Sequence, residues 1–442
     1  MLHLKKAPCT WTLILTFAWF FLTGIPSISQ QKEVSTGSES KELELVLNLD
    51  FYDMIYLDPP YCKGVKNRDG HYSREQLEAL ITRAADSGFS IINFRVAIAG
   101  KVAYRSNIKD QGDDQPEISR TLQAYDPLAV AIDSAHKNGI KCYVWMTPFD
   151  DSGNVKGYEE RGRGIMQSKF SWLNPQYQLL SREGDDPLWG VYSFGHPEVV
   201  DYWISQIHEI LAYKPDGVFF SDRTHSNMSQ RQIEYGFNPP VIERYQKLHG
   251  GDPRDPAHYD LGRFSSVQGD FYTDFLRKAA KHVRDAGARF MVKVSWRQED
   301  SCIAYRLGSL DKSFFQWEKW IEEGIIDELV IGGDAATGTG PEFVLPYFDT
   351  GAEISRPDYF RQKPHSIPIY RWLTLQDWAW PAEEDKVVNG SGAKTFKKPI
   401  VKTMLTEVQK SGVNGVLMHE ALVIDSFDHW DLYKEVSSAF SE

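Results

Sequence analysis

The sequence predicts a (β/α)8 TIM barrel, an α/β fold in which eight parallel strands alternate with helices and close into a ring. From about residue 44 onward, short apolar runs alternate with longer stretches of helical periodicity, and turn residues separate them. Eight such runs occur in the chain of 442 residues, and closing eight strands into a barrel removes both sheet edges. A doubly wound open sheet is the structural alternative, but no G-x-G-x-x-G sequence follows the first strand.

The strands and helices can be assigned one after another along the chain. The predicted strands are Leu45 to Leu49, Ile91 to Val96, Lys141 to Met146, Gly217 to Ser221, Phe290 to Val294, Leu329 to Ile331, Ile367 to Trp372 and Gly415 to Met418. The predicted helices are Ser73 to Ser87, Pro127 to Asn138, Pro197 to Leu211, Asp270 to Asp285, Trp317 to Glu323 and Thr395 to Lys410. Most of these helices end at a glycine-containing stop signal, which supports their boundaries.

The chain is longer than a typical barrel of about 250 residues, and the surplus lies in three long βα loops. They follow strands three, four and seven and span Thr147 to Gly195, Asp222 to Gln268 and Leu373 to Lys394. All three leave from the C-terminal ends of strands, which is the face where barrel enzymes assemble their active sites. We therefore expect the extra chain to build a cleft over that face.

The N-terminal region has the layout of a secretory signal. Two lysines precede an apolar run over residues 11–22, and small residues follow it. This pattern predicts a signal peptide over residues 1–29, a flexible lead-in over 30–43 and a single barrel over 44–442. The mature protein is then secreted or periplasmic, with no stable membrane span. A retained N-terminal membrane anchor is the alternative.

Composition and missing motifs exclude several kinds of function. A formal net charge of −12 argues against a general nucleic-acid binder. The three cysteines that follow the leader are widely spaced, so they predict neither a disulfide framework nor a thiolate metal site, and at most Cys62 and Cys302 form a bridge. No zinc-helix, Walker or serine-nucleophile motif occurs. We expect no metal and no cofactor, and the sequence carries no signal of an oligomeric state.

The strongest candidate catalytic residue is Asp222. It ends the apolar run of the fourth predicted strand, directly before Arg223, and in a barrel this end opens onto the catalytic face. Apolar neighbours favour the protonated form that a general acid needs, whereas Arg223 favours the ionised form of a nucleophile, so both roles stay open. Arg223 and His225 begin the loop that follows and are candidates for substrate binding.

Glu420 is the candidate partner of Asp222. It follows the eighth predicted strand, again as a carboxylate directly after an apolar run. Two carboxyl groups that flank the scissile bond are the standard apparatus of glycoside hydrolysis, and an outward-facing or ion-paired Glu420 is the alternative. Three further carboxylates follow strands three and six and are substitutes for Glu420 as the partner: Asp150, Asp151 and Asp334. Asp150 and Asp334 are also candidates for substrate binding.

Two basic residues lie within apolar strands. Lys293 interrupts the fifth predicted strand, and Arg95 lies midway along the second. A buried cation needs a partner, so both indicate acidic groups inside the barrel mouth, unless they line the helix-facing side and extend to solvent. Arg297 has the same parity as Lys293 and is a further candidate for substrate binding.

Tryptophans cluster at or just after the predicted strand ends. Their rings can stack on the apolar faces of sugars, although any single one is more often part of the core. The candidates for substrate binding are Trp145, Trp296 and Trp372, and Trp378 and Trp380 follow the seventh strand.

The order of several short motifs resembles the glycosyl hydrolase-like 10 family of secreted bacterial barrels. The motifs are Tyr125-Asp126-Pro127-Leu128, Ala135-His136-Lys137-Asn138-Gly139-Ile140, Trp145 to Pro148, Gly195-His196-Pro197-Glu198-Val199, Asp216 to Asp222 and Trp320 to Asp327. The resemblance runs from about Arg74 to Leu432. It implies a barrel that acts on glycans through a carboxylate after strand four, and Asp222 falls at that position.

Three positions depart from the family pattern. The family's double Asp after strand four is Ser221-Asp222 here, its Gln-Val-Arg stretch is similar to Arg95-Val96-Ala97, and its Pro-Gln after strand six is similar to Ile331-Gly332. We therefore predict an enzyme that hydrolyses a glycosidic bond of a polysaccharide or oligosaccharide at the C-terminal face by carboxylate acid/base catalysis. The alternatives are a catalytically silent carbohydrate-binding barrel and a barrel lyase or isomerase that uses Lys293 as base.

Overall fold

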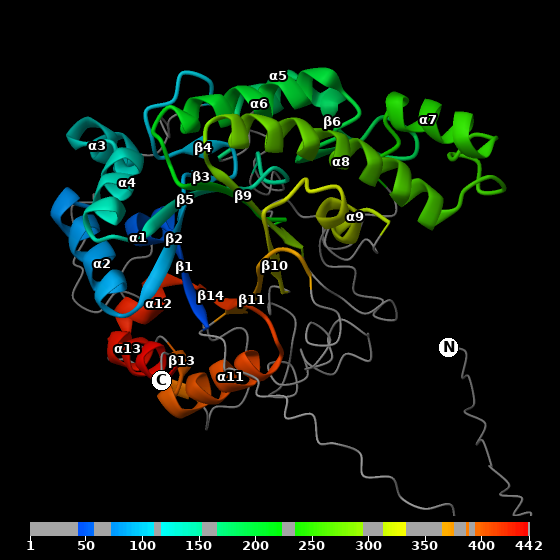
Figure 1. The fold of residues 1–442 in the computed structure, drawn as a ribbon. Helices are drawn as coiled ribbons and strands as arrows, with labels where there is room; N and C mark the ends of the chain where they lie inside the picture. Colours follow the sequence, from blue (N-terminus) through cyan, green and yellow to red (C-terminus); the bar gives the residue numbers. More distant parts are fainter. Residues whose placement is uncertain are drawn as a thin grey trace, which may run out of the picture. The chain divides into compact units, whose positions relative to one another are not determined.

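The computed structural model describes residues 43–56, 72–109, 116–152, 166–222, 235–294, 313–332, 365–374, 386–388 and 394–440. Eight parallel strands form a closed barrel in the order β1, β14, β11, β10, β9, β8, β5 and β2 (Figure 1). Their bounds are β1 Glu44–Asp50, β2 Phe89–Arg95, β5 Lys141–Met146, β8 Gly217–Phe220, β9 Arg289–Val294, β10 Glu328–Ile331, β11 Ile369–Thr374 and β14 Gly415–His419. The predicted fold class is confirmed.

Helices surround the barrel, and short strands extend its loops. The helices are α1 Phe51–Tyr56, α2 Arg74–Asp86, α3 Pro116–Ala124, α4 Pro127–Lys137, α5 Lys169–Leu173, α6 Pro197–Leu211, α7 Pro239–His249, α8 Leu261–Asp285, α9 Trp317–Glu322, α11 Lys398–Lys410, α12 Ala421–Ser426 and α13 Trp430–Phe440, with the 3-10 turn Pro175–Tyr177. Three antiparallel pairs add β3 Ala97–Ile98 with β4 Lys101–Val102, β6 Gln178–Leu180 with β7 Pro187–Tyr192, and β12 Lys386–Val388 with β13 Lys394–Phe396.

Three predicted boundaries are wrong for identifiable reasons. Helix α8 begins at Leu261 rather than at Asp270. Two glycines in its first half weaken the helical pattern of the sequence, but the Asp260 side chain accepts a hydrogen bond from the Arg263 amide at 2.8 Å and caps the earlier start. Strand β11 begins at Ile369, directly after Pro368, which has no amide hydrogen to donate. Helix α11 begins at Lys398, and residues 394–396 form β13 instead.

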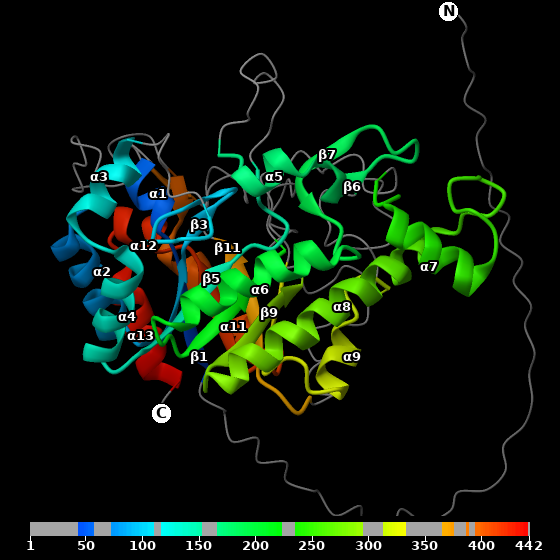
Figure 2. The ribbon, with the colours of Figure 1, turned by 90° about the horizontal axis from the view of Figure 1, so that it is seen from above.

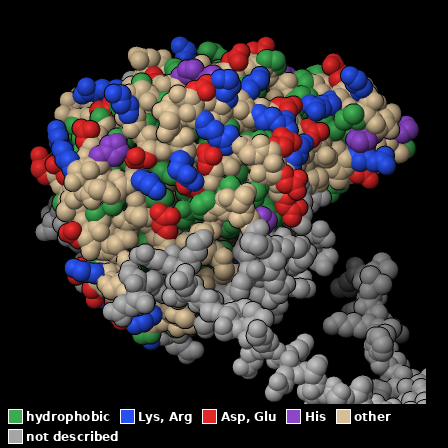
Figure 3. Space-filling model, in the orientation of Figure 1, with side chains coloured by type: hydrophobic (Ala, Val, Ile, Leu, Met, Phe, Trp, Pro, Cys, Tyr) green, Lys and Arg blue, Asp and Glu red, His purple; other side chains and the backbone are tan. Residues whose placement is uncertain are grey.

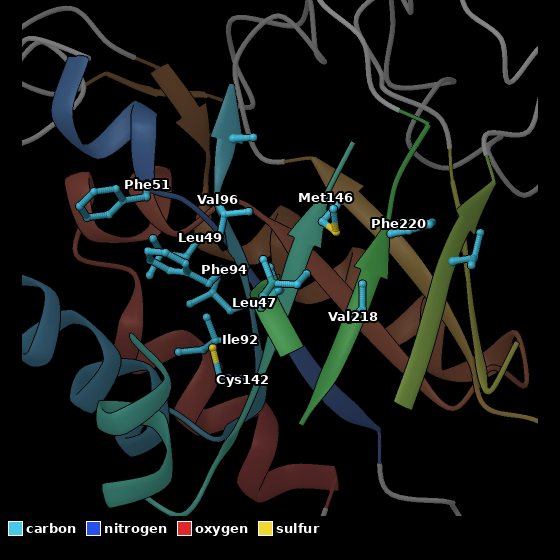
Figure 4. Packing of buried hydrophobic residues seen from close by; sticks show 14 of the residues in the cluster. Leu47, Leu49, Phe51, Ile92, Phe94, Val96, Cys142, Met146, Val218 and Phe220 are labelled. Carbon is cyan, nitrogen blue, oxygen red and sulfur yellow. The ribbon is translucent and has the colours of Figure 1, made fainter. Parts of the chain in front are cut away.

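Alternation along the strands divides the barrel side chains into two sets. The set that points outward packs against the surrounding helices. Figure 4 labels ten residues of this packed cluster, among which Phe51 begins α1 and Val96 directly follows β2: Leu47, Leu49, Phe51, Ile92, Phe94, Val96, Cys142, Met146, Val218 and Phe220. The set that points inward fills the barrel and comprises Val46, Ile91, Tyr143, Trp145, Phe219, Met291, Val330, Tyr370, Trp372 and Leu417. Parity therefore decides which strand side chains can reach a site in the barrel.

A polar network closes the N-terminal end of the barrel. Arg289 donates to Glu328 at 2.5 Å, and the Tyr143 hydroxyl donates to the same carboxylate at 3.1 Å. The Tyr370 hydroxyl donates to Glu44 at 2.7 Å. Burial raises the pKa of Glu328, and Arg289 opposes that shift. These groups lie at the end of the strands opposite to Asp222, so their role is structural.

Other sequence expectations concern cysteines and membrane segments. Cys142 is a free and buried thiol, and burial raises its pKa. Cys62 and Cys302 lie outside the described residues, as do the predicted signal peptide and nearly all of the lead-in. Among the helices that the structure describes, none combines the length and the apolar character that a membrane crossing needs. On the face drawn in Figure 3, acidic and basic side chains are interspersed over the described surface.

Candidate active site

A buried ion pair lies at the C-terminal end of β8. Asp222 follows this strand, and Lys293 comes from the neighbouring strand β9. The Lys293 ammonium donates to Asp222 Oδ1 at 2.5 Å, and the two side chains are only 1% and 2% exposed. Lys293 is in phase with inward-facing Met291, so it points into the barrel.

Aromatic rings join this ion pair to the centre of the barrel. The Lys293 ammonium lies 4.9 Å from the centre of the Trp372 ring, and Trp372 meets Trp145 edge to face at 5.9 Å. The Trp145 indole donates to the Ser221 hydroxyl at 2.8 Å. Ser221, where the resembling family has the first Asp of its pair, therefore points into the barrel and holds a tryptophan.

A second charged group links the ends of β1, β2 and β5. Arg95 donates to Asp50 at 2.5 Å and to Asp150 at 3.0 Å, and its guanidinium lies 5.2 Å from the centre of the Trp145 ring. The three charged side chains are completely buried. The Ala99 amide also donates to Asp150, at 3.3 Å. One cation thus serves two carboxylates, and this triad carries a net negative charge.

Glu420 is connected to the other site residues by its neighbour His419. His419 ends β14 and packs against Trp372 at a centroid distance of 4.7 Å with the ring planes 35° apart, and it meets Trp145 edge to face at 5.8 Å. Its Nδ1 lies 3.9 Å from Glu420 Oε2, and both side chains are buried. The peptide bond between the two residues is cis. Glu420 directly precedes α12.

Asp151 belongs to a separate network, although it follows Asp150 in the chain. Its carboxylate accepts from Lys109 at 2.5 Å and from Tyr202 at 3.2 Å, and also from the hydroxyls of Ser168 and Tyr192. All these groups are buried, and burial together with the Asp151 charge raises the pKa of both tyrosines. Asp151 thus anchors the insertion after β5 to the barrel and to α6, so it is committed to structure rather than to acid/base chemistry.

An aromatic cluster adjoins the same end of β8. Tyr272 of α8 is buried near Asp222, and its pKa is raised well above the ordinary value, first by burial and then by the Asp222 charge. Its ring packs against Phe149 at 4.9 Å and against Phe194 at 5.1 Å. These rings come from the insertion after β5, so the insertion and α8 meet beside the candidate catalytic carboxylate.

The structure brings seven of the predicted site residues into one connected set. These are Arg95, Trp145, Asp150, Asp222, Lys293, Trp372 and Glu420. The predicted residues Arg223, His225, Trp296, Arg297 and Asp334 lie outside the described residues, as do Trp378 and Trp380.

Burial is a property that all seven share. The side chains of Arg95, Trp145, Asp150 and Glu420 are completely buried, and those of Asp222, Lys293 and Trp372 are exposed by 5% or less. Arg95, Trp145 and Asp150 bond to other protein groups and remain predicted substrate-binding residues. Their burial follows from their place inside a closed barrel of eight strands, whose interior is a packed core.

The sequence analysis missed His419 and Asp50. Alternation along the strands could have predicted both residues. His419 lies two residues after inward-facing Leu417, and Asp50 lies four residues after inward-facing Val46, so both side chains point into the barrel. Within the ranges that the structure describes, no group of three or more His, Cys, Asp or Glu side chains is arranged to hold a metal ion.

The closed barrel of eight parallel strands, with charged groups at its C-terminal end, defines the class of the protein as a (β/α)8 barrel. The fold is similar to the PgaB (BpsB) glycoside hydrolase domain from Bordetella bronchiseptica, with a TM-score of 0.55 and 15% identity over 89% of this chain and 99% of that domain. It is also similar to the catalytic domain of β-amylase from Paenibacillus polymyxa, with a TM-score of 0.52 and 12% identity over 90% of this chain and 99% of that chain.

Comparison of the sequence assigns the protein to a family. Residues 46–332 match the Glycosyl hydrolase-like 10 family, and the chain belongs to this family. A relative, glycosyl hydrolase DigH of Escherichia coli (strain K12), is 24% identical over 336 residues, which cover 71% of this chain and 68% of the relative. Family membership confirms the resemblance drawn from the motifs and the predicted class of enzyme.

Proposed function

We propose that the protein hydrolyses a glycosidic bond of an oligosaccharide or polysaccharide at the C-terminal end of the barrel. Asp222 acts as the ionised carboxylate and Glu420 as the proton donor. The observation that carries this proposal is the buried ion pair between Asp222 and Lys293, at a position where barrel enzymes place catalytic groups. It favours the ionised one of the two roles that the sequence left open for Asp222.

The two carboxyl groups then divide the reaction between them. Glu420 gives a proton to the oxygen of the leaving sugar as the bond from that oxygen to the anomeric carbon breaks. Asp222 either attacks the anomeric carbon or removes a proton from the water that attacks it. The separation of the groups decides between them, since about 5 Å favours retention and about 6.5 to 9.5 Å favours inversion.

The charge of the surroundings supports a cation-like transition state. Among the described residues of the candidate site, three carboxylates face two cations, Arg95 and Lys293, while Glu420 holds the proton that it donates: the carboxylates are Asp50, Asp150 and Asp222. An oxocarbenium-like transition state develops positive charge, and a surplus of fixed negative charge in a dry site stabilises it.

The ion pair also bears on the lyase or isomerase alternative. That reaction would need Lys293 as a neutral amine that accepts a proton. A lysine that donates to a carboxylate at 2.5 Å in a buried site is held as an ammonium, which is no base. We therefore disfavour the lysine-base mechanism.

A catalytically silent glycan-binding barrel is the second candidate function. The observation that favours it is Ser221, which stands where the family has the first Asp of its pair and bonds to the indole of Trp145. One carboxylate that relatives carry is thus replaced by a packing contact. Activity measurements separate the two functions.

The test is a panel of polysaccharides and aryl glycosides, assayed with the wild type, Asp222→Asn and Asp216→Asn. Asp216 is a matched control at the opposite end of β8, where it accepts a hydrogen bond from the Cys142 amide at 2.8 Å. We expect Asp222→Asn to lower kcat/KM by about 10²- to 10⁴-fold or more while glycan binding persists. Asp216→Asn should keep its turnover. Equal turnover by Asp222→Asn would contradict the assignment, and binding without turnover by the wild type would support the silent barrel.

A second variant tests the proton donor. Glu420→Gln should lose turnover of glycosides with an alkoxide or sugar leaving group. It should keep much of its turnover of dinitrophenyl glycosides, because their leaving group departs without protonation. The same loss on both kinds of substrate would remove Glu420 from the donor role.

A further inference from the structure

The insertion after β5 carries a pair of tryptophans, one exposed and one half-buried, that the catalytic assignment does not use. Trp172 lies on α5 and Trp189 lies on β7; their ring centroids are 6.2 Å apart and their planes differ by 27°. Trp172 is 40% exposed, and the neighbouring Leu173 is 59% exposed. Such apolar surface is costly to leave in water, and clustered exposed rings mark binding surfaces.

We propose that Trp172 and Trp189 form a second glycan-binding site, which holds an uncharged polysaccharide chain outside the catalytic mouth. The name tryptophan platform is used below for these two residues. The class of ligand rests on the proposed function, whereas the existence of a binding surface rests on the geometry of the rings.

The platform is held rigidly by buried groups behind it. Helix α5 is capped by Ser168, whose hydroxyl accepts from the Ser171 amide at 2.9 Å and also bonds to Asp151. Phe170 of the same helix stacks on Tyr202 at 4.0 Å with planes only 6° apart. A ring that is fixed before binding loses little conformational entropy when a ligand arrives, so the anchoring favours affinity.

The β7 side of the platform is anchored in the same network. Gly190, next to Trp189, accepts from the Asp151 amide at 2.9 Å and donates to the Gln178 side chain at 2.8 Å. A side chain at Gly190 would meet Ser152 backbone at 2.4 Å, so the strand packs closely on the segment that follows β5. The segments that carry the two tryptophans thus both bond to Asp151, through Ser168 and through Gly190. Asp151 directly follows Asp150 of the buried triad.

The surroundings carry few charges, which favours an uncharged ligand. The segments Phe170–Ser181 and Pro187–Gly195 contain no charged residue, and the one charged residue of α5 is the exposed Lys169 at its start. In the turn between the two segments, Arg182 lies 4.4 Å from the ring centres of both Phe237 and Tyr259. A neutral sugar offers apolar ring faces for stacking and hydroxyls for the exposed amide of Gln176, whereas a polyanion would find the single cation Lys169 on α5.

The location connects the platform with the proposed active site. The insertion leaves from the C-terminal end of β5, which pairs with β8, the strand that leads to Asp222. Figure 2 shows α5 and β7 on the same side of the barrel as α1, which directly follows the C-terminal end of β1. A long chain held on the platform can therefore reach the face where the bond is cut.

The test measures binding of starch, xylan, chitin and alginate in native affinity gels, with Asp222→Asn as the background that prevents turnover. Trp172→Ala and Trp189→Ala should each weaken binding of an uncharged polymer about tenfold, the equivalent of about 1.4 kcal/mol of lost stacking. Trp172→Phe should restore part of it. The matched control is Leu248→Ala on α7, which removes an apolar side chain that is 54% exposed and should leave binding unchanged.

The outcomes separate this inference from the proposed function. Unchanged binding in both alanine variants, loss only with alginate, or no binding of any polymer by Asp222→Asn overturns the platform. A concentration-dependent dimer that Trp172→Ala dissociates also overturns it, because a second copy then covers the rings. If the alanine variants bind weakly while no form hydrolyses a glycan, the platform stands and the proposed hydrolysis fails. An unchanged midpoint of urea unfolding shows that the variants are folded.

Discussion

Replacement of Arg95 by methionine tests whether the barrel mouth is dry. Arg95 is the shared cation of two buried carboxylates, Asp50 at 2.5 Å and Asp150 at 3.0 Å, and it lies over the ring of Trp145. Breaking a buried ion pair costs about 3–5 kcal/mol because it leaves an uncompensated charge. Loss of a desolvated cation–π contact adds about 2 kcal/mol.

The sum, about 5–7 kcal/mol, is a large part of the 5–15 kcal/mol by which folded proteins are usually stable. Urea unfolding at pH 7 measures it, and with an m-value near 3 kcal/mol/M the midpoint should fall by about 2 M. A loss below about 1 kcal/mol, which is the range of surface ion pairs, would refute the reasoning that these groups are desolvated.

Two further variants identify the source of the loss. Arg95→Lys keeps the charge but cannot bridge both carboxylates, so its midpoint should fall between those of the wild type and Arg95→Met. A triple variant that adds Asp50→Asn and Asp150→Asn should recover most of the stability if unpaired charge is the cause. No recovery would instead assign the loss to the packing of Arg95 on Trp145.

Other predictions address backbone contacts, pH and a missed residue. Gly100→Ala should lower the free energy of unfolding by about 1–3 kcal/mol, because its new Cβ would lie 2.0 Å from the Ser168 amide nitrogen. Gly262→Ala, at an open helical position, should raise the free energy of unfolding by about 0.5–1 kcal/mol. Urea unfolding measures both changes. Burial, with help from Lys398, lowers the pKa of His429, so the unfolded chain binds a proton more readily and stability should fall as the pH drops below about 6.5. His429→Gln should show a smaller loss between pH 7 and pH 5, and an unchanged slope would contradict the assignment. His419→Phe keeps a ring for packing but no nitrogen, so thermal unfolding should change little while kcat falls; full activity would remove His419 from the site.

Much of the fold could be predicted from the sequence because its signals are local. Eight apolar runs with turn residues between them gave the strands, and alternation along a strand indicated that Lys293 needs a buried partner. Asp222 was found for the same reason, as a carboxylate that directly follows an apolar run. Where glycines weakened the local pattern, as at the start of α8, the prediction placed the boundary too late.

The composition of the site could not be predicted in the same way, because its contacts join strands that are far apart in the chain. The sequence indicated that Lys293 needs a buried acidic partner, and only the structure shows that this partner is Asp222, 71 residues away. It offered Asp150 and Asp151 as equivalent substitutes, yet the first bonds to Arg95 and the second anchors the insertion. His419 lies in the site because closure of the barrel brings β14 beside β11 and packs the imidazole against Trp372.

The sequence by itself thus determined which segments are strands, which of their side chains point inward and which charges need a partner. Those properties depend on chain geometry with a period of two residues. Only the tertiary structure decided which charge meets which, because the relative register of parallel strands is set by packing around the whole barrel and not by any one segment.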